Sequence, residues 1–150
     1  GAGLVSACQK AFGKIGWSAT VSPSNPNELW LNLGEKADVL AHVVKSNAQA
    51  KRTDLALLGE SVINYWGEHE SEPKGLLVAC TWSNRPPSER SEPDFTEALA
   101  EFAKKKNLCL MTSMQLLCIF KDLELGTIGA EDVRHKIMET SGILSGFSLT

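Results

Sequence analysis

One stretch of the chain decides the expected fold: residues 27–46 read NELWLNLGEKADVLAHVVKS. Its segments LWLNL and DVLAHVV are apolar and β-branched enough for half-buried strands, and the GEK between them has the composition of a tight turn. With the turn centred on the glutamate and lysine of GEK, antiparallel pairing places Glu28 opposite residues 43–45. The stretch therefore predicts a β-hairpin that brings an acid close to Lys45.

The composition is that of an ordinary globular domain, with 150 residues, 43% hydrophobic and 22% charged. A chain of this length buries roughly 70% of its unfolded surface, which is enough for one domain with a real core. No apolar run approaches the roughly 20 residues needed to cross a bilayer, and no basic-then-apolar leader opens the chain. We therefore expect a cytoplasmic domain with no membrane partner.

Apolar periodicity predicts the other elements. The expected helices cover residues 4–15, 54–66, 94–106 (or 96–106), 113–120 and 130–138. The expected strands cover residues 17–21, 29–33, 38–44, 75–82 and 108–112. The order α-β-β-β-α-β-α-β-α-α predicts one α/β domain with a mixed five-stranded sheet, in which three strands form a meander and two follow helical crossovers. Residues 1–125 are the expected core, and residues 126–150 the C-terminal helix and tail of the same domain.

Short motifs occur along these elements in a characteristic order. They are KIGW at 14–17, NELW at 27–30, VVK at 43–45 and KGLLV at 74–78, extended by PPSER at 86–90 and by residues 108–116. In this order they resemble bacterial members of the restriction-endonuclease-like, or PD-(D/E)xK, nuclease superfamily. The resemblance implies a three-layer α/β/α domain in which paired acids and a lysine, on adjacent strands, use Mg²⁺ to hydrolyse phosphodiester bonds.

The chain departs from that pattern where the chemistry would occur. The family has aspartate at the position of Glu28 and a second acid at the position of Val43, and only Lys45 is kept. Magnesium prefers near-octahedral oxygen ligation, which an aliphatic side chain cannot supply. The resemblance therefore implies a degenerate site, in which Glu28 and Lys45 are vestigial catalytic residues.

Other residues are poor replacements for the missing acid. Glu60 points nearly away from the apolar face of its predicted helix, Asp54 suits an N-cap, and Asp38 flanks the hairpin turn. His42 points opposite to Val43 by strand alternation, so it is a base only if the pairing slips, and otherwise a structural or surface residue. The cysteines and histidines lack metal-ligand spacing, so no zinc site is expected.

Two functions remain open at this point. The first is a catalytically inactive nuclease-like domain of a larger bacterial protein, without a cofactor, which binds DNA or RNA through Lys45, Arg85 and Arg90 or regulates by contact with other domains or a second copy. The second is a divergent endonuclease that uses Glu28 as metal ligand, Lys45 and Mg²⁺. The missing acid favours the first, while the net charge of −3 disfavours general nucleic-acid binding.

Overall fold

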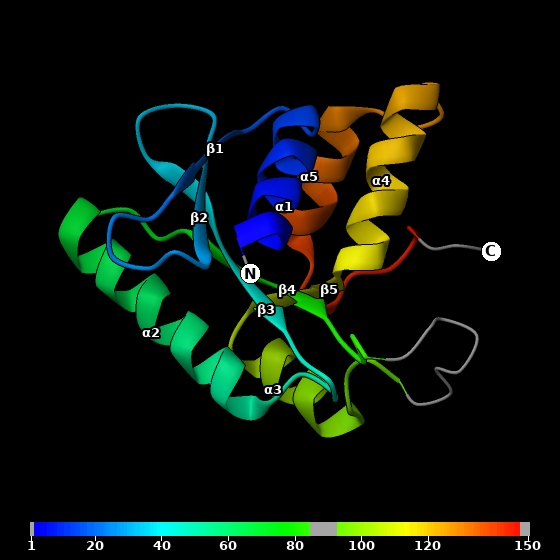
Figure 1. Ribbon diagram of the computed structural model, residues 1–150. Helices are drawn as coiled ribbons and strands as arrows, with labels where there is room; N and C mark the ends of the chain where they lie inside the picture. The colour runs from blue at the N-terminus through cyan, green and yellow to red at the C-terminus, as the bar shows by residue number, and fades with distance from the viewer. Residues whose placement is uncertain (1, 85–92, 148–150) are drawn as a thin grey trace.

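Figure 1 shows the computed structural model of the protein, which describes residues 2–84 and 93–147. Within these ranges the helices are α1 (Ala2–Lys14), α2 (Arg52–His69), α3 (Glu97–Lys105), α4 (Ser113–Leu125) and α5 (Ala130–Glu139). The strands are β1 (Ser18–Val21), β2 (Glu28–Asn32), β3 (Ala37–Lys45), β4 (Lys74–Cys80), β5 (Leu108–Thr112) and β6 (Gly142–Ile143). None of the helices in these ranges is both long and apolar enough to cross a bilayer.

The strands form one mixed sheet in the order β1-β2-β3-β4-β5-β6. The first three strands pair antiparallel as a meander, while β4, β5 and β6 each pair parallel with the preceding strand. The parallel pairs follow from the helices between these strands, because a crossover returns the chain to the same end of the sheet. The mixed α/β class and the predicted order of elements up to α5 are therefore confirmed.

The predicted number of strands is wrong, because the described residues form six. The extra strand, β6, lies in the C-terminal tail and pairs with β5. It has only two residues, too few for an apolar pattern to be visible in the sequence. Contacts with distant residues hold this segment: the Leu144 amide donates to the Leu110 carbonyl at 2.8 Å, and Gln115 Nε2 donates to the Leu144 carbonyl at 2.9 Å.

The sheet is buried on both faces, so the domain has two apolar cores. One core joins the sheet to α1, α4 and α5 and contains Phe12, Val43 and Ile119. The other joins the sheet to α2 and α3 and contains Leu40 and Leu58. Figure 1 shows the two helix layers on opposite sides of the strands. Strand β3 contributes to both cores, which explains its near-continuous apolar sequence.

The contact between α2 and the sheet depends on Gly75 in β4. A Cβ atom there would lie 2.5 Å from Leu108 Cδ2 and 3.1 Å from Val62 Cγ2. We expect Gly75→Ala to lower the free energy of unfolding by about 1–3 kcal/mol, because the packed core must shift to make room. Urea denaturation measures this change.

Gly59→Ala in α2 is the matched control, since a Cβ at Gly59 meets nothing within 4 Å. There the added methyl group should stabilise the helix, by up to about 1 kcal/mol, because alanine has the higher helix propensity. Equal effects of the two substitutions would contradict the packing described for Gly75.

Candidate functional site

The β2–β3 hairpin sets the geometry of the predicted site, and its register differs from the expected one. Glu28 pairs with His42 rather than with residues 43–45. The ladder runs Leu31↔Val39 and then Asn32↔Ala37, so one residue of β3, Asp38, is extra at a bulge. A shift of one residue moves a side chain to the other face of a sheet.

The structure therefore does not bring Glu28 and Lys45 together. Val43 packs in the core beneath α1, α4 and α5, whereas Leu40 and Val44 pack in the core beneath α2 and α3. Alternation along β3 then puts Lys45 on the face of Val43, and His42 on the face of α2. Because Glu28 contacts His42, the acid and the lysine lie on opposite faces of the sheet.

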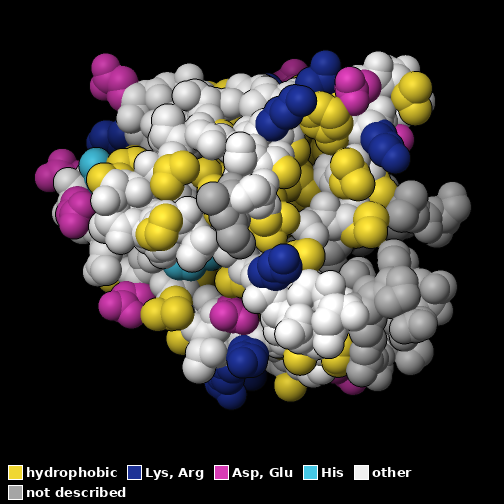
Figure 2. Space-filling model, in the orientation of Figure 1, with side chains coloured by type: hydrophobic (Ala, Val, Ile, Leu, Met, Phe, Trp, Pro, Cys, Tyr) yellow, Lys and Arg dark blue, Asp and Glu magenta, His cyan; other side chains and the backbone are white. Residues whose placement is uncertain are grey.

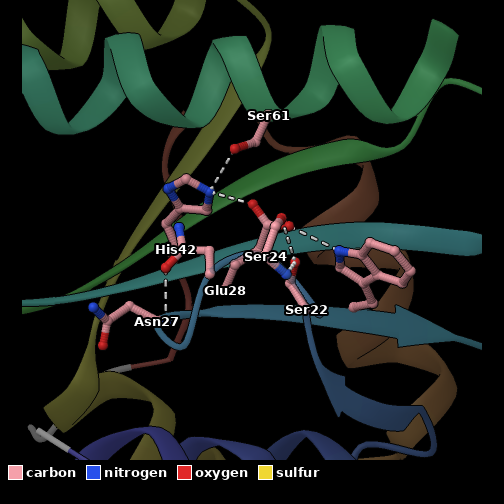
Figure 3. A network of polar contacts seen from close by, with 8 residues as sticks. Ser22, Ser24, Asn27, Glu28, His42 and Ser61 are labelled. Atoms are coloured by element: carbon pink, nitrogen blue, oxygen red, sulfur yellow. Dashed lines mark hydrogen bonds and ion pairs between the residues drawn. The ribbon is translucent and has the colours of Figure 1, made fainter. Parts of the chain in front are cut away.

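Glu28 and His42 form a buried polar cluster beneath α2 (Figure 3). Both residues are buried, with 5% and 7% of their surfaces exposed, and Glu28 Oε1 lies 2.7 Å from His42 Nε2. Trp30 Nε1 donates to Glu28 Oε2 at 2.8 Å. Ser61 Oγ, from α2, lies 3.1 Å from His42 Nε2. Both carboxylate oxygens of Glu28 thus have partners inside the protein.

These contacts keep the Glu28 carboxyl group ionised. Burial alone raises its pKa, but hydrogen bonds from His42, Trp30 and Ser61, together with the charge of His42, outweigh burial and lower the pKa from 4.5 to about 2. An ionised carboxylate can only accept hydrogen bonds, so His42 Nε2 carries the hydrogen that points at Glu28. The sequence-based prediction that His42 points opposite to Val43 is confirmed, and its position is an interior one.

The cluster resembles a nucleophile–histidine–acid triad in composition but not in geometry. A triad needs the acid on one ring nitrogen and the hydroxyl group on the other, so that the free nitrogen removes the hydroxyl proton. Here Glu28 and Ser61 contact the same nitrogen, Nε2. Because that nitrogen already donates to Glu28, it cannot take a proton from Ser61. The arrangement stabilises the fold and does not activate a nucleophile.

The other carboxylates considered as replacements have separate roles. Asp38 Oδ2 accepts hydrogen bonds from Trp17 Nε1 at 3.1 Å and from the Leu33 amide at 3.2 Å, beside the turn as predicted. Asp54 is not the N-cap that was predicted: the N-cap of α2 is Lys51, and Asp54 lies at the third helical position, where its Oδ2 accepts from the Lys51 amide at 2.8 Å. Glu60 is exposed on α2. In the described ranges, no group of three or more His, Cys, Asp or Glu residues could hold a metal ion.

The predicted phosphate-binding residues can be followed only in part. Lys45 is exposed at the last position of β3, in register with Cys80 of β4. This is the carboxyl edge of the parallel strands. Arg85 and Arg90 lie outside the described residues. Any binding role of Lys45 therefore belongs to the edge of the sheet, away from the Glu28 cluster.

A hollow at this same edge was missed by sequence reasoning. Its volume is about 790 Å³, within the usual range of ligand pockets. It lies where β4 and β5 end and α4 begins, and its apolar lining includes Leu4, Met114, Leu117, Ile143 and Leu144. Ligands of α/β sheets often bind outside the carboxyl ends of the strands, so the strand order alone could have indicated the edge. It could not indicate that α1 and the C-terminal segment form the walls.

The polar groups around the hollow are largely paired with one another. Thr81 donates to Asp94, and Thr112 Oγ1 accepts from the Gln115 amide at 3.0 Å. Gln115 in turn donates to the Leu144 carbonyl. Because these polar groups bond to one another, the hollow offers mainly apolar contacts to a ligand. It therefore suits apolar side chains better than phosphates.

The Glu28 cluster gives a pH-dependent contribution to stability. We expect Glu28→Gln to lower the free energy of unfolding at pH 7 by about 1–3 kcal/mol, because it weakens the buried hydrogen bonds of His42 and Trp30. The contribution of the ionised group is full above the unfolded pKa near 4.5 and is lost as the pH falls to about 2. Urea denaturation between pH 2 and pH 7 should therefore show the gap between wild type and variant closing at low pH.

The control for this series is Glu60→Gln, which removes an exposed carboxylate from the neighbouring helix α2. Its effect should stay within about 0.5 kcal/mol at every pH, as for most surface substitutions. A gap between wild type and Glu28→Gln that is independent of pH would contradict the ionised cluster.

Comparison with known proteins found no matching family model, no significant match among curated proteins and no significant match among solved structures. The function proposed for this chain therefore rests on its own residues and their arrangement.

Proposed function

We propose that this chain is a catalytically inactive, restriction-endonuclease-like domain of a larger bacterial protein that acts as a regulatory interaction module. Its element order and mixed sheet are compatible with that fold, in which a meander precedes two parallel strands. The short motifs fall at matching places: KIGW ends α1 and leads into β1, NELW enters β2, and KGLLV forms most of β4. These placements support the resemblance without extending it to an activity.

The single observation that carries the loss of catalysis is the separation of Glu28 from Lys45. A metal-dependent nuclease needs the acid and the lysine at one ion and one phosphate. Here the Glu28 carboxylate lies under α2 with both oxygens engaged, and alternation along β3 assigns Lys45 to the opposite face, that of Val43. Val43, at the position of the second acid, packs in an apolar core. Moving Glu28 to the face of Lys45 would require β2 to slip against β3.

The carboxyl edge of the sheet supports binding, and its chemistry favours a protein partner. The hollow there is lined mostly by apolar side chains, and the exposed residues Met114, Leu117 and Ile143 surround it. A nucleic acid would need several cations facing the phosphates, and the chain carries a net charge of −3. Lys45 remains a candidate for a phosphate contact, in which case binding would weaken steeply with salt.

The test is a cleavage assay with the whole chain. Single-stranded and double-stranded DNA and RNA are incubated with Mg²⁺ or Mn²⁺, beside Lys45→Ala as the matched variant. We expect no cleavage above the level of the variant, because Glu28 is engaged with His42 and Val43 occupies the position of the second acid. Robust cleavage that Lys45→Ala abolishes would overturn the proposal and establish the divergent endonuclease.

A calorimetric titration with Mn²⁺ adds an independent readout. Both carboxylate oxygens of Glu28 already accept hydrogen bonds from the protein. We therefore expect Mn²⁺ to give the same heats with wild type and with Glu28→Gln. Binding in wild type that Glu28→Gln removes would instead identify Glu28 as a metal ligand.

A further inference from the structure

The seam between α1 and α4 forms a second apolar feature, which we call the α1–α4 groove. It has a volume of about 210 Å³ and is lined by Leu4, Ala7, Cys8, Lys10 and Ala11 of α1 and by Ser113, Leu116, Leu117 and Phe120 of α4. Leu4, Ala7, Ser113 and Leu117 also line the hollow at the carboxyl edge, so groove and hollow are continuous. Figure 2 shows hydrophobic side chains gathered in a depression over these two helices, with Lys or Arg side chains and an Asp or Glu side chain at its borders.

The two helices that line the groove differ in the size of the side chains that they contribute. The α1 wall carries the small residues Ala7 and Ala11 at helical spacing, which let another backbone approach closely. The α4 wall carries Leu117 and Phe120, and 48% of the surface of Leu117 is exposed. The exposed Leu117 beside the two alanines provides a contact surface for the apolar face of another protein segment.

Lysines lie beside the groove on both helices, two on α1 and one on α4. Lys10 lines it, Lys14 follows one turn later on α1, and Lys121 follows Leu117 by one turn on α4. Among the described residues none of these lysines belongs to an ion pair, and α1 contains no acid. On α4, Asp122 follows Lys121 directly and Glu124 lies in the last turn. The cations are thus available to a partner.

We propose that the α1–α4 groove binds an amphipathic helix of a protein partner, with its apolar face in the groove and acidic side chains over Lys10, Lys14 and Lys121. The inference rests on the proposed interaction function and names the partner's chemistry. Helices bind grooves of this kind through apolar residues spaced by three or four positions. Each wall helix has 13 residues, about 20 Å, which matches a partner helix of three to four turns. The hollow at the end of the groove takes a large apolar anchor side chain.

Other occupants fit these observations less well. A nucleic acid would place phosphates over a floor of aliphatic side chains, where only the rim lysines attract them. A second copy in a two-fold contact would present the same lysines to each other, because such an interface uses one patch on both subunits. An amphipathic helix with acidic flanks matches both the apolar lining of the groove and the lysines beside it.

The experiment is a selection from a displayed library of helical peptides against the whole chain. The peptides are about 14 residues long with leucine fixed at positions i, i+3, i+4 and i+7, and the flanking positions are random. Wild type should enrich Asp and Glu at the flanks. The double charge reversal Lys10→Glu with Lys121→Glu should enrich Lys and Arg there instead, an exchange that a change in stability would not cause.

A synthetic peptide from the enriched pool then locates the site by fluorescence anisotropy. Leu117→Glu should weaken its binding about tenfold or more, since a charge replaces a central apolar contact. The matched control is Leu57→Glu, because Leu57 is 58% exposed on α2, on the other side of the sheet, and should leave the affinity unchanged. Both positions are exposed, so both variants should keep the wild-type melting temperature.

Three results would overturn the inference: no enrichment of peptides, the same flanking charges selected by wild type and the charge reversal, or equal losses in Leu117→Glu and Leu57→Glu. Displacement of the peptide by an oligonucleotide in low salt would assign the groove to nucleic acid instead. The cleavage assay is separate from these readouts. Nuclease activity together with peptide binding would contradict the proposed loss of catalysis but not the groove inference. Absence of both nuclease activity and peptide binding would contradict only the groove inference.

Discussion

The pairing of Glu28 with His42 across the β2–β3 hairpin is the contact on which the interpretation of this domain depends. A carboxylate that is 95% covered is stable only with partners, and His42, Trp30 and Ser61 supply them. Two of these partners come from the hairpin and one from α2, so the cluster joins the meander to the helix that covers it. The same bonds give both carboxylate oxygens of Glu28 a donor inside the protein.

The register has this effect because strand side chains alternate between two faces. In β3 the even face carries Leu40, His42 and Val44, and the odd face carries Val43 and Lys45. A nuclease site of the kind the motifs resemble needs acids and lysine on one face. In this chain Val43 shares the face of Lys45. Glu28, whose oxygens are hydrogen-bonded, lies on the other face of the sheet. An acid introduced at position 43 would still leave Glu28 buried beneath α2.

Most of the fold could be predicted from the sequence, because apolar periodicity and turn residues are local signals. The register of the hairpin could not. It depends on the bulge at Asp38, whose carboxylate binds the Leu33 amide and the indole of Trp17, a residue from an earlier part of the chain. Strand β6 could not be predicted either, because its segment is held by hydrogen bonds to Leu110 and Gln115, which are distant in the sequence. Glu28 and Lys45 were correctly placed on adjacent strands, but their expected proximity was wrong, because Glu28 pairs with His42.

The direct connection between β5 and α4 explains why the α1–α4 groove lies on the side of the sheet away from Glu28. Thr112 is both the last residue of β5 and the N-cap of α4, so no loop separates strand from helix. The helix therefore starts at the carboxyl edge of the sheet and runs back beside α1, which leaves Leu117 on the rim instead of in the core. The buried acid and the open groove thus occupy opposite faces of one sheet. The contacts that bury Glu28 therefore place no constraint on the side chains that line the groove.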